Sequence, residues 1–101
     1  MAEFVSVARR GDIAEGQGKS FEVSGKTIAL FCINGTFYAI DNTCVHRGGP
    51  LAEGQLEGTL ITCPWHRWQY EVTTGACRTN PNARVSSYPV RVDGDDIQVN
   101  C

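Results

Sequence analysis

Two short segments decide the fold of this chain, Cys44-Val45-His46 and Cys63-Pro64-Trp65-His66. They form the pattern C-x-H followed, after sixteen residues, by C-x-x-H, and they contain both histidines of the sequence. Cysteine thiolate and neutral imidazole are well suited to soft and borderline metals, so the pattern predicts a metal site. The candidate ligands are Cys44, His46, Cys63 and His66.

The order of residues within each segment indicates which metal is bound. A structural zinc finger usually keeps its cysteines in one segment and its histidines in the other. Here each segment has one cysteine followed closely by one histidine. Two mixed segments can place both thiolates on one iron and both imidazoles on a second iron, which is the ligand set of a Rieske [2Fe–2S] centre. A structural zinc module is the alternative, and it would be colourless where a Rieske protein is brown.

Length and charge limit the class of protein. With 101 residues the chain is expected to form one domain, and a metal centre would add stability to its modest core. A net charge of −2 gives no indication of nucleic-acid binding. No segment approaches the roughly 18 apolar residues of a membrane span, and the N-terminus lacks the pattern of a signal peptide. We therefore expect a soluble cytoplasmic protein without membrane contact.

Three of the five cysteines lie outside the two segments. An odd number excludes a complete disulfide framework within one chain, so reduced thiols are expected. Cys32 lies in an apolar run and is predicted to be a buried strand thiol. Cys77 is predicted to be a packing or surface thiol, and Cys101 to lie in a frayed end.

Charge is distributed unevenly along the chain. The stretch 44–84 holds four basic and three acidic residues, whereas the flanking stretches hold five and eight. Arg47 and Arg67 directly follow the two histidines. These arginines are either solvated surface residues or residues that tune the metal centre and contact an acidic partner.

Alternating apolar residues predict β-strands throughout, with Asn34-Gly35 as a strong hairpin turn. Glycine and proline are dense between about 43 and 81, as loops need where the backbone approaches an inorganic core. We expect a β base formed from about 1–42 and 82–101, with a cluster-binding part at about 43–81 inserted in it. The expected strands are 4–8, 20–23, 27–33, 36–40, 59–62, 69–72, 84–87, 88–92 and 97–99.

The residues Cys44–Gly49 and Cys63–His66, followed by Tyr70–Gly75, resemble a Rieske-type ferredoxin, and the similarity extends over nearly the whole chain. The paired motif is specific because all four residue types and both spacings must coincide. The resemblance implies an all-β Rieske fold of stacked antiparallel sheets, in which a small cluster-binding subdomain is inserted in a β base. It also implies one Rieske-type [2Fe–2S] cluster per chain, held at one tip of the molecule.

The resemblance also implies individual roles for residues near the cluster. Cys44 and Cys63 would ligate the buried iron, and His46 and His66 the outer iron. Pro81 falls where the family has a proline-containing loop that covers the cluster, although a proline that ends a strand is the alternative.

Departures from one subtype of the family predict a low reduction potential. The Rieske proteins of respiratory and photosynthetic cytochrome complexes have two further cysteines, at positions that match Gly49 and Trp65, so their disulfide cannot form here. They also direct a serine hydroxyl at a bridging sulfide, where this chain has Trp68. Loss of that hydrogen bond removes stabilisation from the reduced state. We therefore expect a potential toward the low end of the Rieske range of about −150 to +300 mV.

Tyr70 would act in the opposite direction. A tyrosine at this spacing in the high-potential subtype donates a hydrogen bond to a ligand cysteine, which would raise the potential. The alternative is a core aromatic residue whose hydroxyl is bonded elsewhere.

The resemblance implies a one-electron carrier and not an enzyme. Two imidazoles in place of two thiolates leave the oxidised core formally neutral, which makes reduction easier. The implied partners are a flavin-dependent ferredoxin reductase and a terminal ring-hydroxylating oxygenase, contacted transiently by a monomer. A small subunit of a nitrite reductase complex is the alternative function. The candidate contact residues are His46, Arg47, Trp65, His66 and Pro81, although Trp65 could instead pack inward.

Overall fold

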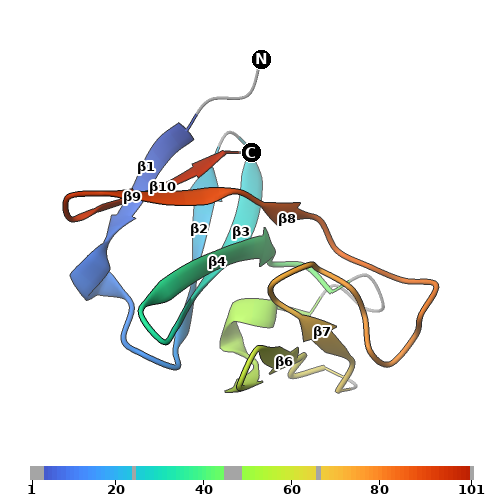
Figure 1. Cartoon of the computed structure of the whole chain (residues 1–101). Coiled ribbons are helices and arrows are strands. Elements are labelled where there is room, and N and C mark those ends of the chain that lie inside the picture. Colours follow the sequence, from blue (N-terminus) through green and yellow to red (C-terminus); the bar gives the residue numbers. More distant parts are fainter. Residues whose placement is uncertain (1–3, 24, 45–48, 66, 101) are drawn as a thin grey trace.

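The computed structural model describes residues 4–23, 25–44, 49–65 and 67–100. Within these ranges the regular structure consists of ten strands in three antiparallel sheets and two 3-10 helices of three residues each (Figure 1). The prediction of an all-β fold is therefore confirmed. Neither helix in this part of the chain has the length and hydropathy that crossing a membrane would require.

The first sheet joins the two ends of the chain. It contains β1 (Phe4–Arg9), β10 (Asp96–Asn100) and β9 (Val90–Asp93), with β10 in the middle. Phe4 pairs with Asn100, so the first and last described residues lie side by side. The 3-10 helix η1 (Arg10–Asp12) follows β1, and the N–H of Arg10 donates to the carbonyl of Asp95 in the β9–β10 turn at 2.9 Å.

The second sheet has the order β2 (Gly18–Val23), β3 (Lys26–Ile33), β4 (Thr36–Asp41) and β8 (Ser87–Tyr88). Asn34 and Gly35 connect β3 to β4 with φ of 53° and 77°. Left-handed values at both central residues are those of a type I′ turn, as the sequence predicts.

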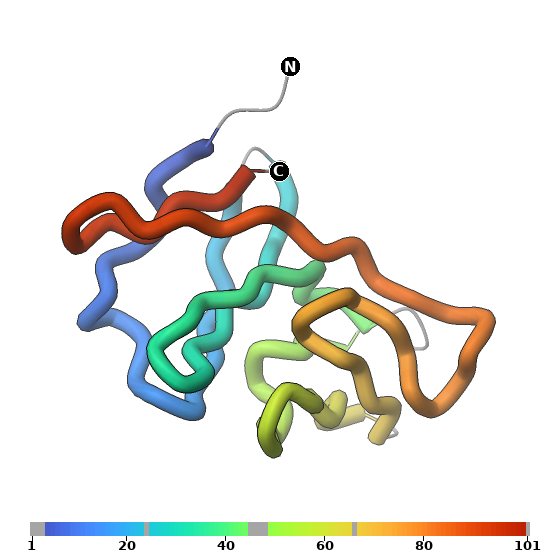
Figure 2. The backbone as a smooth tube through the Cα atoms, in the orientation of Figure 1, coloured from blue at the N-terminus to red at the C-terminus, as the bar shows by residue number. Residues whose placement is uncertain are grey.

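The third sheet positions the second cysteine. It contains β5 (Gln55–Glu57), β6 (Leu60–Thr62) and β7 (Gln69–Glu71), preceded by the 3-10 helix η2 (Leu51–Glu53). Figure 1 shows β6 and β7 at the opposite end of the molecule from the turns of the first sheet. The chain then loops out past this sheet and returns to β4 as β8, which the tube in Figure 2 makes plain.

Three details differ from the predicted strands. The predicted strand 84–87 is wrong, because Arg84 forms only an isolated bridge with Ala76 and regular pairing begins at Ser87. The predicted strand 88–92 is divided at Pro89, which has no N–H for a ladder, so β8 belongs to one sheet and β9 to another. The sequence pattern also missed η2 and β5, each of which is only three residues long.

The second sheet has a hydrophobic core on each of its two faces. On β3, Ala29, Phe31 and Ile33 face a core that also contains both motif cysteines. The alternate residues Ile28, Leu30 and Cys32 face a second core, which the first sheet covers. We call these the cluster-side core and the base core. Because successive side chains of a strand point to opposite faces, one buried strand supports both cores.

Candidate metal centre

Hydrogen bonds join the described residues Asn42 and Cys44 to those from Gly49 onward. The N–H of Cys44 donates to the carbonyl of Gly49 at 3.0 Å. The N–H of Leu51 donates to the carbonyl of Asn42 at 2.7 Å, and the N–H of Ala52 donates to its side-chain Oδ1 at 2.8 Å. Asn42 is also the buried polar side chain of the described residues. Sequence reasoning did not single out this residue, because these bonds join segments about ten residues apart.

Cys63 begins a tight loop at the end of β6. Its N–H donates to the carbonyl of Trp68 at 2.7 Å, which closes the loop five residues later. Arg67 adopts a left-handed backbone conformation with φ of 60°, which is uncommon for a residue other than glycine. The backbone of Arg67 is therefore held in a conformation that costs energy and that the surrounding contacts maintain.

The two motif cysteines lie together in the protein interior. The exposed fractions are 1 % for Cys44 and 0 % for Cys63. Burial raises the pKa of the Cys63 thiol, whereas the backbone N–H of Trp65, which donates to its sulfur, acts to lower it. The Cys44 side chain, hydrogen-bonded to the Cys63 thiol, adds to the increase. A buried pair of thiolates is unfavourable without a cation, so this donor set fits a thiolate-binding metal.

Gly49 allows the two loops to approach closely. A Cβ atom at this position would lie 2.6 Å from Sγ of Cys63 and 3.1 Å from Cβ of Trp65. Any side chain here would therefore displace the second cysteine. The positions expected to be joined by a disulfide in the high-potential subtype are thus neighbours in space, but they are occupied by glycine and tryptophan.

Tyr70 contacts the sulfur of the first cysteine. Its hydroxyl oxygen lies 3.1 Å from Sγ of Cys44, in a buried hydrogen bond, and its side chain is fully buried. This geometry agrees with the predicted bond to a candidate ligand cysteine and not with a hydroxyl bonded only elsewhere.

The third loop near this site contains Pro81. Cys77 is buried at its start, and its Sγ accepts the N–H of Asn80 at 3.3 Å. The N–H of Ala83 donates to the carbonyl of Asn80 at 3.0 Å, so the loop turns at Pro81, which is exposed. Pro81 therefore lies in a turn and does not end a strand.

Cys77 packs in the cluster-side core, and the predicted burial of Cys32 on β3 is confirmed.

Trp65 is exposed. Half of its surface, 51 %, is accessible to solvent, so the alternative that it packs inward is wrong. Next to it, Pro64 and Arg67 line a cavity of about 230 Å³ whose wall includes Cys63. The described surface beside Cys63 therefore combines an exposed indole, a proline and an arginine.

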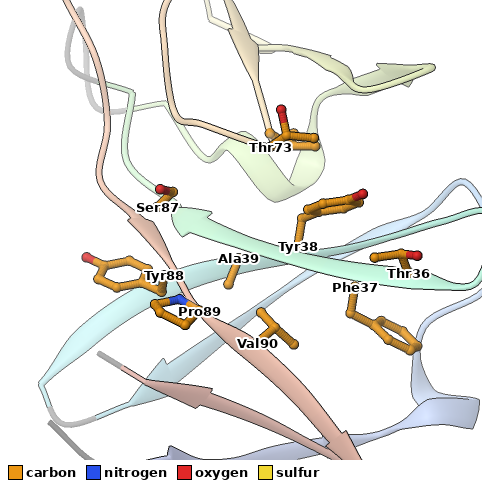
Figure 3. Close-up of a pocket in the computed structure, with 10 residues that line it drawn as sticks. Thr36, Phe37, Tyr38, Ala39, Thr73, Ser87, Tyr88, Pro89 and Val90 are labelled. Carbon is orange, nitrogen blue, oxygen red and sulfur yellow. The ribbon is translucent and has the colours of Figure 1, made fainter.

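A separate cavity of about 500 Å³ lies away from the cysteines. Figure 3 shows it between β4, the chain around Pro89 and Thr73, with the hydroxyl groups of Tyr38, Thr73 and Ser87 around it. Among the described residues, β8 pairs with β4 only at Ala39 and Ile40, so the first half of β4 borders this opening.

The two histidines and Arg47 lie outside the described residues. Within the described part of the chain, no group of three or more potential metal-ligating side chains occurs. The structure thus brings together Cys44 and Cys63, and the positions of His46 and His66 remain predictions from the motif.

Buried neighbouring thiols on Cys44 and Cys63, at one end of the β-sheets, are the donor set of a thiolate-bound metal. Residues 3–89 match the family model described as the Rieske [2Fe-2S] domain. The chain therefore belongs to the Rieske [2Fe–2S] domain family, and its cofactor is a Rieske-type cluster.

Similar proteins with established names indicate which kind of Rieske protein this chain is. The chain is 36 % identical over 91 residues to the ferredoxin component of naphthalene 1,2-dioxygenase/salicylate 5-hydroxylase systems from Ralstonia sp, covering 89 % of this chain and 88 % of the relative. The ferredoxin of carbazole 1,9a-dioxygenase from Nocardioides aromaticivorans has the same fold, with a TM-score of 0.90, 31 % identity and 95 % coverage of both chains.

This chain is also similar to a chain in the complex of reduced oxygenase and oxidized ferredoxin in carbazole 1,9a-dioxygenase. Its TM-score is 0.88 at 27 % identity, covering 96 % of this chain and 92 % of that one. The predicted Rieske fold is confirmed, and the chain is an electron-transfer ferredoxin of the dioxygenase type and not itself a catalyst.

Proposed function

We propose that this chain is the freestanding electron carrier of a ring-hydroxylating dioxygenase system. It takes one electron at a time from a flavin-dependent reductase and delivers it to a terminal oxygenase. The observation that carries the proposal is the pair of buried thiols, Cys44 and Cys63, at the ends of two closed loops. Support also comes from the similarity to the dioxygenase ferredoxin component of Ralstonia sp and to a ferredoxin in complex with its oxygenase.

The proposed ligands are the two thiolates on one iron and His46 and His66 on the other. When bound, the cluster supplies reversible one-electron chemistry. The protein contributes hydrogen bonds to the ligand sulfurs, from the N–H of Trp65 to Cys63 and from the hydroxyl of Tyr70 to Cys44. These bonds stabilise negative charge on sulfur and therefore favour the reduced state.

The remaining proposals concern organisation. We infer a single domain over 1–101 with the cluster-binding part at about 43–81 in a base of about 1–42 and 82–101, acting as a monomer in the cytoplasm. The separate third sheet and its short loops support this division. A large subunit that copurified in constant ratio would instead indicate a fixed subunit of an enzyme complex.

The test of the ligand assignment is Cys44→Ser and Cys63→Ser, each compared with Cys32→Ser. Both ligand variants are expected to purify colourless and to lack the paramagnetic signal of a reduced Rieske centre. Cys32 is equally a buried cysteine but faces the base core, so its variant should retain colour and signal. A normal Rieske spectrum in both ligand variants would overturn the assignment.

The proposed role is tested by reconstitution with a reductase and terminal oxygenase of a dioxygenase system. Product formation should require this chain with its cluster. Failure of every such system to turn over, with an intact cluster, would argue against the role.

A further inference from the structure

The turn between β3 and β4 contains the one Asn-Gly pair of the sequence, Asn34 and Gly35. Both residues are exposed to solvent. Asparagine is among the thermolabile residues of proteins, and a glycine that follows it has no Cβ to shield its backbone nitrogen. That nitrogen can therefore approach the side-chain carbonyl carbon of the asparagine, which is the requirement for spontaneous deamidation.

Deamidation at this turn needs water and no other co-reactant. The nitrogen of Gly35 loses its proton and forms a bond to Cγ of Asn34, and the side-chain nitrogen leaves as ammonia, so that a cyclic succinimide results. Water then breaks one of the two C–N bonds of the ring. The product at position 34 is aspartate when the bond to Cγ breaks, and isoaspartate when the bond to the backbone carbonyl breaks. Nothing is oxidised or reduced.

The carboxylate of Glu15 binds the nitrogen that would react. Its Oε1 accepts the N–H of Gly35 at 3.0 Å, and its Oε2 accepts the N–H of Asn34 at 2.6 Å. The thiol of Cys32 also donates to Oε1, at 3.8 Å. A carboxyl group with these donors is ionised at neutral pH. A negative charge therefore lies in contact with the amide that must lose its proton.

Two effects of this carboxylate oppose ring closure. Deprotonation of the Gly35 nitrogen would place a second negative charge 3.0 Å from Oε1 of Glu15, and like charges at this distance repel. The ring also closes only after the peptide plane between Asn34 and Gly35 turns toward Cγ. Bonds from two successive N–H groups to one carboxylate resist that rotation. Both effects disappear while the bonds to Glu15 are open.

Backbone hydrogen bonds hold Glu15 in place beside the turn. The N–H of Gly16 donates to the carbonyl of Cys32 at 2.8 Å, and the N–H of Cys32 donates to the carbonyl of Gln17 at 3.1 Å. On the other side of Glu15, Ile13 is buried in the base core. The segment that carries Glu15 is thus fixed on both sides, so the fold itself keeps the carboxylate at the turn.

We propose that Asn34 is a hydrolytic modification site whose rate of deamidation is controlled by Glu15. The carboxylate keeps the Gly35 nitrogen protonated and the turn closed, so the reaction proceeds only while these bonds are open. This modification goes beyond the proposed function and does not depend on it, because no step involves the cluster or an electron.

Modification would release the segment that Glu15 fixes. Isoaspartate adds one carbon to the backbone, so two successive N–H groups no longer lie opposite the two carboxylate oxygens. Aspartate at the same position adds a carboxylate near that of Glu15, and the two repel. In either product the bonds that join Gly16 and Gln17 to Cys32 are expected to open more often.

The test compares the rate of deamidation in wild type and in Glu15→Gln. Glutamine keeps one acceptor oxygen but has no charge, so the rate constant for Asn34 in the native protein at neutral pH should rise roughly fivefold. Peptide mass spectrometry of samples taken during incubation measures this rate. In concentrated urea the two proteins should react equally fast, because the protection requires the folded turn.

The matched control is Glu22→Gln, which removes the same charge from an exposed position on β2. It should leave the rate for Asn34 unchanged. Asn82, which is exposed and precedes Ala83, is an internal reference whose rate should be the same in all three proteins. Equal native rates for Asn34 in wild type and Glu15→Gln would overturn the proposal, and so would an equal acceleration in Glu22→Gln.

Hydrogen exchange separates protection by Glu15 from a loss of global stability. In Glu15→Gln the amide of Leu30, in the middle of β3, should lose much less protection than Asn34 gains in rate. Equal factors would mean that global unfolding causes the acceleration, which would contradict the proposal. In deamidated wild type, separated by ion exchange, the amides of Gly16 and Cys32 should exchange roughly tenfold faster. Unchanged exchange there would contradict the predicted release of this segment.

Discussion

The sulfur of Cys44 illustrates how single residues set the properties of this site. Tyr70 is fully buried and lies with its hydroxyl 3.1 Å from that sulfur. A hydroxyl that donates to a thiolate stabilises the more negative, reduced state. The same residue therefore partly offsets the low potential expected from Trp68, which occupies the position of the serine in the other subtype.

Tyr70→Phe should lower the midpoint potential. A hydrogen bond contributes about 1 kcal/mol. For a one-electron couple, 59 mV corresponds to about 1.4 kcal/mol, so a decrease of about 40 mV is expected. Protein-film voltammetry measures the change, with Tyr38→Phe as the control because Tyr38 lies by the separate cavity on β4. An unchanged midpoint in Tyr70→Phe would show that the hydroxyl does not influence the couple.

The roles of the motif cysteines and of Tyr70 could be predicted from the sequence, because the chemistry of these side chains is specific. The structural role of Asn42 could not, because its two bonds depend on the backbone of residues 51 and 52 returning beside it. The N–H of Trp65 bonded to Cys63 likewise depends on loop conformation, including the left-handed Arg67.

Among the elements, the β3–β4 hairpin is stabilised by a residue distant in sequence. The carboxylate of Glu15 accepts the N–H groups of Asn34 at 2.6 Å and Gly35 at 3.0 Å. These bonds hold the pKa of Glu15 below its ordinary value, with the bond from Asn34 as the largest cause. The turn residues therefore both determine the hairpin and fix the preceding loop to it.

Glu15 should make stability depend on pH. Because its pKa is lower in the folded state, its contribution is present above the unfolded glutamate pKa of about 4.3 and is lost as pH falls through the folded value. Wild type should thus lose stability more steeply in this acid range than Glu15→Gln. Urea unfolding as a function of pH measures the difference, and Glu22→Gln on β2 is the control. Parallel curves for wild type and Glu15→Gln would exclude the linkage.

The strand β10, which alternates, and the apolar runs of β3 and β4 on either side of the Asn34-Gly35 turn could be predicted from sequence. The short strand β5 and helix η2 could not, because three residues show no period. The division at Pro89 was predictable in principle from the missing N–H, but which sheet receives each half depends on the pairing of β9 with β10.

At the scale of the whole molecule, the two cores imply two regions that differ in their stability against unfolding. The base core is enclosed by long strands, with six paired positions between β2 and β3. The third sheet has three paired positions between each pair of strands, and its core includes the two cysteines. Metal binding therefore stabilises mainly the third sheet and the cluster-side core.

Removal of the cluster should unfold the molecule locally. Amides of β5, β6 and β7 should exchange much faster in the apo protein, by roughly tenfold or more, whereas those of β2 and β3 should stay protected. Hydrogen exchange followed by mass spectrometry distinguishes the two regions, with the loaded protein as the reference. A uniform loss of protection would indicate one cooperative unit.

The two faces of β3 have a further consequence for protein engineering. Ile28 and Leu30 face the base core, whereas Ala29 and Phe31 face the core with the cysteines. A designer can therefore repack one side of this strand for higher thermal stability while leaving the surroundings of the cysteines unchanged. The same separation would let the scaffold diverge during evolution without altering the electronic properties of its centre.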